Sequence, residues 1–494
     1  MSGETESYVE AARREKLTLL RERGITPFAY AYARSHTTAE ALAAFDESEV
    51  PVRVAGRIVA LRGHGKTTFA HLEDAAGRLQ LYFRQDAFGE DGYAVVKLLD
   101  LGDVIGVAGV LFRTRTGEIT VRATELSMLA KALRPLPLGK ADAEGEQHGI
   151  LTDAETRYRE RYADLAVHPE VREIFRVRAQ TVSYLRGFLD GRHFTEVETP
   201  VLQPLYGGAM ARPFVTHHHA LDRRFYLRIA TELYLKRCIV GGMERVYELG
   251  KDFRNEGIDR THNPEFTMLE FYQAYADYLE ILALTEELLA GVVRHVCGTP
   301  VIERFGRRLD FTPPFRRATY EELVREHTGL DTRSASDDEL RALLAQQDVS
   351  DVASLPRTKL VDEIFKVAVE PTLQDPTFVL DFPIELSPLA KPKRGDPALA
   401  ERFELFVLGR ELANAFSELN DPDDQRARFA AQAAARAAGD HEAQQTDEDY
   451  VRALEYGMPP TGGIGIGIDR LVMVLAEQAS IRDVILFPML RTEE

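Results

Sequence analysis

Residues Phe253 to Tyr272 read FRNEGIDRTHNPEFTMLEFY and hold the most informative pattern in the chain. The Arg-bearing start and the apolar end are predicted to be two strands joined by a short polar loop. Because side chains of a strand alternate between its faces, Phe266, Met268, Glu270 and Tyr272 are expected on one face. Such a surface offers a cation for phosphate, an aromatic ring for a base and a carboxylate for a cation. The pattern predicts chemistry on a nucleotide together with a small, positively charged molecule.

The individual residues of this stretch allow both a functional and a purely structural interpretation. A guanidinium fork at Arg254 suits an α-phosphate, and Arg260 and His262 in the loop are within reach of outer phosphates. The ring of Phe266 is suited to stacking on a purine. A surface hairpin laced with salt bridges explains any one of these residues taken singly.

A glycine-rich stretch, TGGIGIGIDRLVMVLAEQ, runs from Thr461 to Gln478. Gly463, Gly465 and Gly467 alternate with isoleucines, so in a strand they share a face and leave room for a ligand against the backbone. The spacing is not the dinucleotide-binding fingerprint, and no βαβ unit surrounds it. Close packing of a strand on a helix is the alternative explanation.

A third stretch, RFELFVLGRELANAFSELND, places Glu404, Glu411 and Glu418 seven residues apart, with Asn414 between them. The spacing alone favours a helix that carries these carboxylates as a solvated stripe. The functional alternative is a pair of carboxylates that hold Mg²⁺, which takes one or two carboxylates together with substrate phosphates.

The stretch RIATELYLKRCIVGG is expected to begin a helix at Thr231. Thr231 is a suitable N-cap, and Glu232 would be a first-turn acid favoured by the helix dipole. That structural role explains Glu232 without any ligand.

The composition narrows the class of protein. A chain of 494 residues with 45% hydrophobic and 28% charged residues is expected to form two or three globular domains. It has no apolar run of membrane-spanning length and no secretory signal at its start, so the cytoplasm is expected. Only Cys238 and Cys297 occur, which argues against a disulfide framework or a Cys-based zinc site; both are expected to be buried and reduced. The net charge of −18 argues against indiscriminate coating of nucleic acid, although a local basic face remains compatible with a specific partner.

The N-terminal part has strand-like alternation from Val52 to about Met128, with turns at residues 74–77 and 116–117. Several short strands at this spacing predict a small β-barrel of the OB type. Arginines and lysines are interleaved there with Phe69, Tyr82 and Phe83, as single-stranded nucleic acid requires. Aromatic residues that merely fill the barrel are the alternative.

The predicted domain organisation has four parts. Residues 1–48 form a helical extension, 49–132 an OB-fold domain, 133–150 a Pro- and Gly-rich linker, and 151–494 a catalytic domain. A helical insertion is expected at about 317–372.

Taken together, these stretches resemble the signature motifs of class II aminoacyl-tRNA synthetases. FTEVETP, Phe194 to Pro200, resembles their first motif, FRNEG…HNPEF the second, and GIGIGIDR the third. GGAMARPF, ATELYLKR, NAFSELND and IRDVILFP further resemble bacterial-type lysyl-tRNA synthetases, and the similarity covers about residues 5 to 491. The resemblance implies an α+β fold: an N-terminal OB-fold β-barrel that binds the anticodon, then a catalytic domain built on an antiparallel sheet flanked by helices. It also implies a homodimer, with the first motif at the interface.

The resemblance assigns roles residue by residue. Lysine would contact Gly208, Glu232, Glu270, Tyr272, Asn414 and Glu418. ATP would contact Arg254 at the α-phosphate, Glu256 at the adenine amino group, Phe266 and Arg470 around adenine, and Arg260 or His262 at the outer phosphates. Arg254 and Arg470 would be the catalytic residues, Glu404 and Glu411 the Mg²⁺ ligands, and Arg62, Phe69 and Gln80 the readers of the anticodon.

The acidic character of the predicted pocket agrees with lysine as the amino acid, since an aspartate-specific site would need cations there. The implied activity is attachment of lysine to tRNA(Lys) through a lysyl-adenylate. Two alternatives remain at this stage: a lysyl ligase that modifies a translation factor, and a synthetase-like regulator that binds nucleic acid. Two departures from the family pattern are visible: Thr231 stands where Pro is common, and Arg260–Thr261–His262 replaces an Arg directly before the His.

Overall fold

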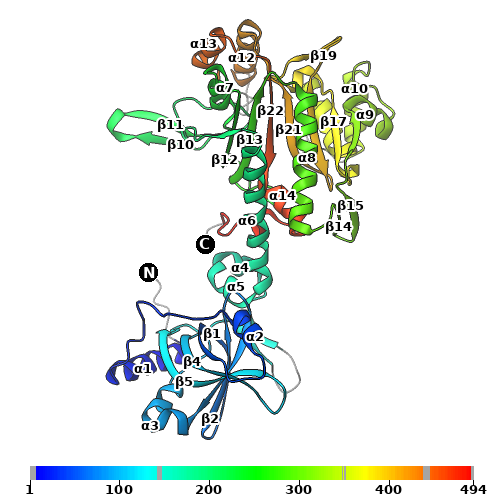
Figure 1. Ribbon diagram of the computed structural model, residues 1–494. Helices are drawn as coiled ribbons and strands as arrows, with labels where there is room; N and C mark the ends of the chain where they lie inside the picture. The colour runs from blue at the N-terminus through cyan, green and yellow to red at the C-terminus, as the bar shows by residue number, and fades with distance from the viewer. Residues whose placement is uncertain (1–6, 142–146, 348, 350–351, 438–444, 491–494) are drawn as a thin grey trace. The chain divides into compact units, whose positions relative to one another are not determined.

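The computed structural model describes residues 7–141, 147–347, 349, 352–437 and 445–490. The chain divides into two compact units, Met1–His168 and Pro169–Glu494 (Figure 1). The division lies downstream of the domain boundary expected at residue 150. Among the described residues, no helix is both long and apolar enough to cross a membrane. Cys238 and Cys297 are free thiols, half-buried rather than fully buried as expected.

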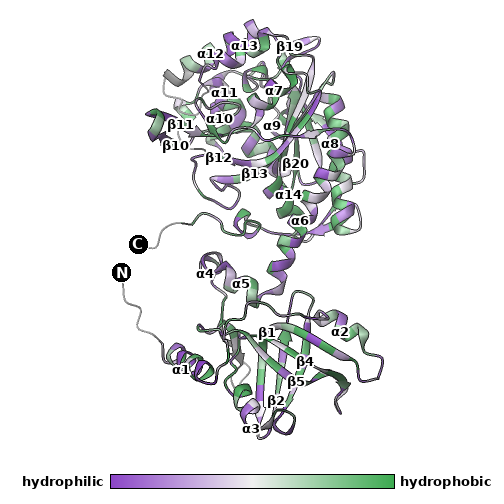
Figure 2. Cartoon of the chain, turned by 60° about the vertical axis from the view of Figure 1, so that its left-hand side comes forward, coloured by the Kyte–Doolittle hydropathy of each residue, from purple (hydrophilic) through white to green (hydrophobic). Residues whose placement is uncertain are grey.

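The N-terminal unit is built on the five-stranded closed barrel predicted from the sequence. Its strand order is β1-β2-β3-β5-β4, and the strands are β1 (Pro51–His64), β2 (Thr67–Glu73), β3 (Arg78–Arg84), β4 (Val104–Arg113) and β5 (Ile119–Ala130). Hydrophobic and hydrophilic positions alternate along these strands (Figure 2). The inward set, which includes Val54, Leu81 and Val107, is fully buried, so the barrel interior is a packed core.

Helices and a small sheet accompany the barrel. They are α1 (Tyr8–Glu22), α2 (Thr38–Ala44), α3 (Gln85–Val96), α4 (Ala154–Arg159), α5 (Arg161–Val167), β6 (Leu138–Ala141) and β7 (Gln147–Ile150). Helix α3, between β3 and β4, was not predicted. The expected linker at 133–150 holds the β6–β7 pair, so part of it is regular structure.

The C-terminal unit is built on an eight-stranded, mostly antiparallel sheet with the order β16-β17-β20-β21-β22-β13-β12-β8. The strands are β8 (Thr195–Glu196), β12 (Arg245–Phe253), β13 (Glu265–Ala274), β16 (Arg316–Thr319), β17 (Thr377–Leu380), β20 (Arg402–Val407), β21 (Arg410–Ser417) and β22 (Thr461–Gly467). Parallel pairs occur only at β8–β12 and β16–β17 within this sheet. The antiparallel sheet predicted for this half of the chain is confirmed.

Smaller sheets and helices surround the main sheet. The sheets are β9 (Leu202–Gln203), β10 (Val215–His218) and β11 (Arg223–Leu227); β14 (Val301–Arg304) and β15 (Arg307–Asp310); β18 (Pro392–Lys393) and β19 (Asp396–Ala400). The helices are α6 (Pro169–Asp190), α7 (Glu232–Val240), α8 (Tyr278–Cys297), α9 (Tyr320–Thr328), α10 (Asp337–Ala345), α11 (Arg357–Ile364), α12 (Pro422–Ala437), α13 (Glu448–Glu455) and α14 (Ile468–Leu475). Short helical turns are η1 (His219–Leu221), η2 (Val352–Ser354), η3 (Phe365–Val369), η4 (Glu370–Thr372), η5 (Ile384–Leu386) and η6 (Ile481–Asp483).

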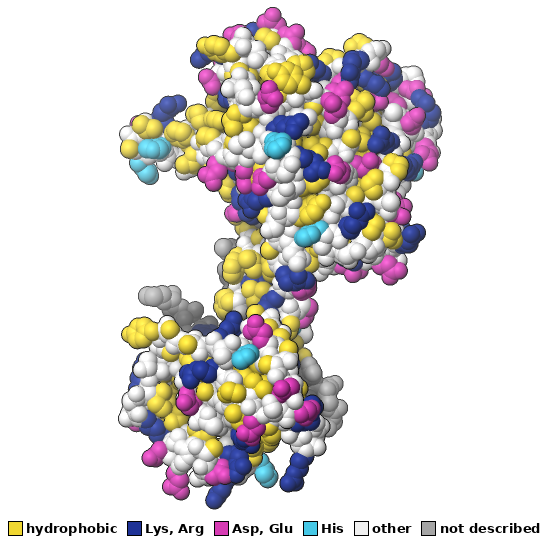
Figure 3. All heavy atoms as spheres, in the orientation of Figure 1, with side chains coloured by type: hydrophobic (Ala, Val, Ile, Leu, Met, Phe, Trp, Pro, Cys, Tyr) yellow, Lys and Arg dark blue, Asp and Glu magenta, His cyan; other side chains and the backbone are white. Residues whose placement is uncertain are grey.

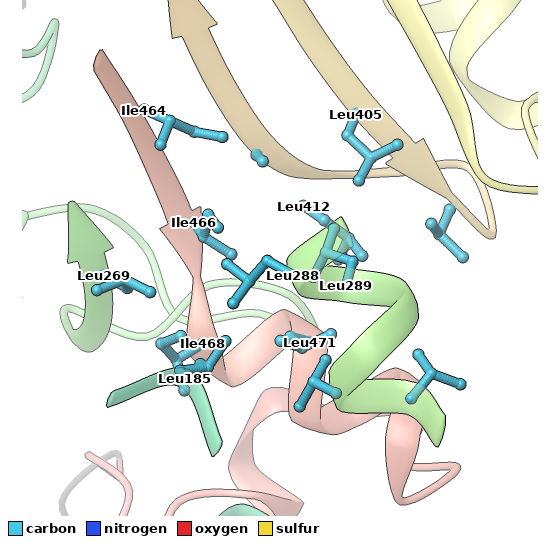
Figure 4. Close-up of a cluster of buried hydrophobic side chains, with 14 of the residues drawn as sticks. Leu185, Leu269, Leu288, Leu289, Leu405, Leu412, Ile464, Ile466, Ile468 and Leu471 are labelled. Atoms are coloured by element: carbon cyan, nitrogen blue, oxygen red, sulfur yellow. The ribbon is translucent and has the colours of Figure 1, made fainter. Parts of the chain in front are cut away.

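One face of the main sheet is covered by α6, α8 and α14, and the side chains between the sheet and these helices form an apolar core (Figure 4). Leu269 from β13 and Ile464 and Ile466 from β22 point into this core together with Leu288 and Leu289 of α8. Their neighbours in sequence must therefore point to the opposite face. Packing on one side thus fixes which residues remain available to a ligand on the other.

The helix favoured by the spacing of Glu404, Glu411 and Glu418 is wrong. These residues lie on the antiparallel hairpin β20–β21 and just after it. Leu408 and Gly409 form the two-residue turn, with φ of 55° and 66°, as a hairpin turn with two left-handed residues requires. A spacing of seven across such a turn places Glu404 and Glu411 on neighbouring strands, because the chain reverses between them.

Candidate active site

Strand register aligns the predicted functional residues across the second face of the main sheet. Glu270 on β13 is paired with Gly465 on β22, Gly465 with Asn414 on β21, and Asn414 with Glu404 on β20. Paired residues of neighbouring strands point to the same face, so this row spans four strands. The expectation that Phe266, Met268, Glu270 and Tyr272 share one face is confirmed, since all four line one cavity there.

The cavity on this face has a volume of about 380 Å³. It gathers nearly every residue expected to bind lysine or ATP: Gly208, Glu232, Arg254, Glu256, His262, Phe266, Glu270, Tyr272, Glu404, Glu411, Asn414, Glu418 and Arg470. Arg260 does not line it. Several other lining residues were not predicted from the sequence, among them Arg402, Phe416 and residues 386–389.

One end of the cavity, here called the acidic pocket, is formed by Glu232, Glu270, Glu418 and Tyr272. All four side chains are buried. Tyr272 donates its hydroxyl hydrogen bond to Glu270 Oε2 at 3.0 Å, and the Thr231 N–H donates to Glu270 Oε1 at 3.2 Å. Burial, followed by the charges of Asp252 and Glu232, raises the pKa of Glu270 to about 8. Burial likewise raises the pKa of Glu418 well above its ordinary value. A bound cation would relieve the cost of keeping these carboxylates ionised.

Lys236 is the main functional candidate that the sequence reasoning missed. It lies one turn after Glu232 on α7, is fully buried, and its Nζ lies 2.5 Å from Glu232 Oε1. The same Nζ also forms an ion pair with Glu418 Oε2. An i, i+4 Glu–Lys pair is usual on exposed helix faces, so only its complete burial distinguishes it.

The glycines of β22 make room for this arrangement. A Cβ added at Gly463 would overlap both Glu418 Oε1 and the Tyr272 ring, and one added at Gly465 would lie 3.0 Å from the Met268 methyl group. Ile464 and Ile466, on the other face, pack into the core. The alternation of Gly and Ile therefore serves the cavity on one face and packing on the other.

The other end of the cavity, here called the nucleotide end, carries cations and an aromatic ring. The Arg254 guanidinium lies 5.0 Å from the centre of the Phe266 ring. Arg470, on the first turn of α14, donates from Nη1 to the Glu411 carbonyl at 2.8 Å, and its Nη2 lies 3.3 Å from His262 Nε2. His262 Nδ1 is in turn 2.8 Å from Asp259 Oδ2. These contacts hold Arg470 and His262 side by side.

A second group of charged residues, Arg228 with Glu248 and Asp252 of β12, adjoins Arg254, which follows β12 directly. Arg228 is buried and contacts Glu248 Oε1 at 2.5 Å and Asp252 Oδ1 at 3.3 Å. It crosses the strand at Gly250, where any side chain would overlap its guanidinium. Burial raises the pKa of Asp252 to about 6, against the opposing charges of Arg228 and Arg254.

Glu404 and Glu411 lie between the two ends. Glu404 forms an ion pair with Arg402, whose Nε donates to Asn414 Oδ1 at 3.0 Å. Burial raises the pKa of Glu404 to about 8, with Arg402 opposing and Glu411 and Glu370 adding to the rise. In the described part of the chain, no three His, Cys, Asp or Glu side chains are grouped to hold a metal ion by themselves. Two carboxylates that repel each other still suit a Mg²⁺ ion that completes its coordination with phosphates and water.

The start of α7 differs from a standard cap. Thr231 is the N-cap residue, as predicted, but its side chain makes no capping hydrogen bond. Its backbone N–H instead donates to Glu270. Thr231 therefore supplies a backbone donor that a Pro at this position would lack.

The barrel presents the residues expected to read an anticodon. Arg62 on β1 is paired in register with Phe69 on β2, whose ring stacks on Tyr82 with centroids 4.6 Å apart. The Gln80 amide donates to Glu118 Oε2 at 2.5 Å, and its oxygen accepts from Thr120 at 2.8 Å. Arg62 is exposed and the aromatic pair is partly exposed, so the stacked rings are accessible from solvent.

Comparisons with known proteins place these observations in a family. Residues 153–491 match the family model described as tRNA synthetases class II (D, K and N), and residues 52–129 match an OB-fold nucleic acid binding domain. The chain is 52% identical over 498 residues to a lysine–tRNA ligase of Moorella thermoacetica, a match that covers 100% of both chains. It is also 52% identical to the lysine–tRNA ligases of Pelotomaculum thermopropionicum, over 100% of this chain and 97% of the relative, and of Carboxydothermus hydrogenoformans, over 98% of both.

Proposed function

The chain belongs to the family of class II lysine–tRNA ligases, and from this membership we propose that lysine and ATP react in the cavity of the C-terminal unit. The activity is the ATP-dependent attachment of lysine to tRNA. The observation that carries the assignment of the site is the buried cluster of Glu232, Glu270 and Glu418 beside Arg254 and Phe266. Three carboxylates at one end suit a cationic side chain, and a guanidinium near an aromatic ring suits a nucleotide.

In the first step, an oxygen of the lysine carboxylate attacks the α-phosphorus of ATP. A new O–P bond forms, the bond to the bridging oxygen breaks, and pyrophosphate leaves with that electron pair. A carboxylate is already a nucleophile, so this step needs no general base. Arg254 neutralises charge at the α-phosphate, and catalysis rests on positioning and electrostatics.

In the second step, the terminal 3′ hydroxyl of the tRNA attacks the lysyl carbonyl and a new C–O bond forms. The bond from the carbonyl carbon to the phosphate oxygen breaks, AMP leaves with that electron pair, and the hydroxyl proton is released. The acidic pocket holds the lysyl side chain through both steps, because Glu270 is fixed by Tyr272 and by the Thr231 N–H. A neutral side chain of the same length would leave those carboxylates buried without a partner.

The nucleotide end suggests how ATP is held. Phe266 and Arg470 sandwich the adenine, and Glu256 accepts from its amino group. His262 contacts the outer phosphates, since it lines the cavity beside Arg470 and Arg260 does not. The position of His262 favours it over Arg260 for the γ-phosphate.

Glu404 and Glu411 are the residues that would hold Mg²⁺. When bound, the ion would neutralise phosphate charge during the first step. Their own contribution is to present two carboxylates, each already paired with an arginine, at the junction of the lysine and nucleotide ends.

The N-terminal barrel binds tRNA, and its face with Arg62, Phe69 and Gln80 reads the anticodon. We place a homodimer contact at Phe194–Pro200, where β8 forms the edge of the main sheet. Val201 and Leu202, directly after it, are 39% and 51% exposed, as apolar residues of an interface would be in a single chain. Because charging of tRNA serves translation, the cytoplasm is the expected compartment.

The experiment that tests the site uses lysine-dependent exchange of pyrophosphate into ATP. Arg254→Ala should lower the exchange rate by about 10²-fold or more, mainly in turnover. Lys251→Ala, a change of a half-exposed cation on β12, the strand that ends directly before Arg254, should leave it unchanged. Near-normal exchange by Arg254→Ala would remove Arg254 from the α-phosphate.

The acceptor is tested in the same preparation by supplying labelled lysine with either tRNA or a translation factor. Transfer to tRNA alone is expected, since the chain carries an intact barrel. Transfer to the protein alone would instead favour the protein-modifying alternative.

A further inference from the structure

Lys236 is a fully buried cation that lies behind the lining of the acidic pocket and pairs with two of its carboxylates, Glu232 and Glu418. It projects from α7 between Glu232 and Glu418, and it lies 5.3 Å from the centre of the Phe416 ring. Burial alone would lower the pKa of Lys236, but the charges of Glu232 and Glu418 outweigh it and hold that pKa above its ordinary value. The two carboxylates therefore favour the charged form of the ammonium group.

Other titratable groups face this ammonium from each neighbouring element. Those that act on it directly are Glu232 on α7, Glu418 after β21 and Tyr450 on α13; Glu270 and Tyr272 on β13 and Arg402 on β20 act on its carboxylate partners. Arg402 is engaged by Glu404, and the Tyr450 hydroxyl is neutral because burial raises its pKa far above neutrality. The charge of the pocket is thus set by three carboxylates and Lys236.

When ionised, three carboxylates and one ammonium leave two negative charges. Free lysine carries two ammonium groups, and its carboxylate is directed to ATP. Lys236 thus matches the charge of the pocket to the amino acid, since without it one carboxylate would remain uncompensated in a buried site.

We propose that Lys236 is a positioning residue that determines specificity: it clamps Glu232 and Glu418 in place and limits the pocket to two negative charges, so that the pocket accepts a dicationic amino acid. The inference rests on the proposed function, because it presumes that lysine binds at the acidic pocket. Lys236 would then be a permanent counter-ion for Glu232 and Glu418, the carboxylates that also bind the substrate.

Removal of the ammonium has a definite consequence for Glu232 and Glu418. With no cation between them, the two carboxylates repel each other and retain protons to a higher pH. Loss of a neighbouring opposite charge shifts a carboxyl pKa upward by about one to three units. Lysine must then displace protons that Glu232 and Glu418 hold more tightly than they do in the native pocket.

The test compares Lys236→Met with the native enzyme by lysine-dependent pyrophosphate exchange between pH 6 and 9. The KM for lysine should rise about tenfold or more at neutral pH, and its pH profile should move upward by about one unit or more. The KM for ATP should change little. Arg237→Met is the matched control, because Arg237 is the next residue on the same helix and pairs with Asp447 at 2.9 Å and Asp449 at 3.3 Å, which lie outside the acidic pocket.

A second variant guards against a folding defect. Lys236→Met combined with Glu418→Gln removes the surplus charge together with its counter-ion, so it should fold and should return the pH profile toward that of the native enzyme. Thermal melting reports folding of each variant. If Lys236 served packing alone, adding Glu418→Gln to Lys236→Met would not restore the pH profile of the KM for lysine.

The inference is overturned if Lys236→Met lowers turnover with unchanged KM for lysine and an unchanged pH profile, or if the double variant fails to shift the profile back. Glu270→Gln, measured in parallel, separates this result from failure of the proposed function. If Glu270→Gln also leaves the KM for lysine unchanged, the acidic pocket is not the lysine site. If it raises that KM while Lys236→Met does not, only the role of Lys236 is wrong.

Discussion

At the scale of single residues, the pocket is defined by carboxylates that are costly to ionise. Glu270 is 5% exposed and accepts hydrogen bonds from Tyr272 and from the Thr231 N–H. Both contacts favour its charged form, yet burial and the nearby acids still hold its pKa near 8. Glu270 therefore holds its proton at neutral pH, and a cation that binds beside it would have to displace that proton.

This predicts a pH dependence for lysine binding. A raised pKa means that Glu270 is mostly protonated below about pH 8, so the KM for lysine should fall as pH rises from 6 toward 8. It should level off above that, until lysine's own side chain begins to deprotonate near pH 10.4. The measurement is the KM for lysine across this range, with the KM for ATP as reference. If the KM for lysine depends on pH in the same way in Glu270→Gln, the pH dependence belongs to another group.

The Thr231 N–H supplies the second residue-scale prediction. Thr231→Pro removes this donor and leaves Glu270 with one fewer contact to its charged form. Because a long hydrogen bond to a charged group contributes about 1 kcal/mol, the KM for lysine should rise roughly threefold to tenfold. Thr231→Ala keeps the N–H and is the control. Equal effects of the two changes would show that the N–H contact is unimportant.

At the scale of elements, β22 depends on the absence of side chains on one face. Gly463→Ala would bring a methyl group into the space of Glu418 and Tyr272. We expect a loss of lysine-dependent exchange of at least about tenfold, since overpacking of this kind costs 1–3 kcal/mol or more. Gly187→Ala, at a helical position of α6 with open space around it, is the control and should be neutral or slightly stabilising. Full activity of Gly463→Ala would mean that the glycine face does not adjoin a ligand.

The barrel face gives a prediction for the other unit. Phe69→Ala removes one ring of the stacked Phe69–Tyr82 pair. Stacking of a base on an aromatic side chain contributes about 1–3 kcal/mol, so the KM for tRNA should rise by roughly 5- to 100-fold. Pyrophosphate exchange, which needs no tRNA, should be unaffected. Tyr30→Ala, which removes a fully exposed ring outside the strands, is the control. If Phe69→Ala impaired exchange and charging equally, the ring would serve folding and not recognition.

Elements with a strict two-residue period were predictable from the sequence, and β13 and β22 are examples. Alternation of polar or glycine positions with Leu and Ile indicates both a strand and its inward face. The hairpin β20–β21 was not predictable from spacing, because a period of seven is shared by a helix and by a chain that reverses at a two-residue turn. The Leu408–Gly409 turn was the available signal. Lys236 was also missed, since sequence does not reveal that a helical Lys is buried.

At the scale of the whole molecule, the proposed site for lysine and ATP and the proposed anticodon face belong to different compact units. The cavity lies within Pro169–Glu494, and the stacked aromatic face lies within Met1–His168. A further surface, the β10–β11 hairpin, carries His217, His218 and His219 and is well exposed (Figure 3). The division explains why substitutions in one unit are expected to affect either activation of lysine or recognition of tRNA, but not both.

The most direct test of lysine recognition by the acidic pocket is pyrophosphate exchange with each of the twenty standard amino acids in turn. Lysine alone should support exchange at a substantial rate. Glu270→Gln should lower kcat/KM for lysine by about 10²-fold or more, because it removes a buried charge opposite the ammonium group. Thr332→Ala, a change in the helical region away from the cavity, should not. Equal exchange with arginine or a neutral amino acid, or full lysine activity in Glu270→Gln, would contradict recognition by this pocket.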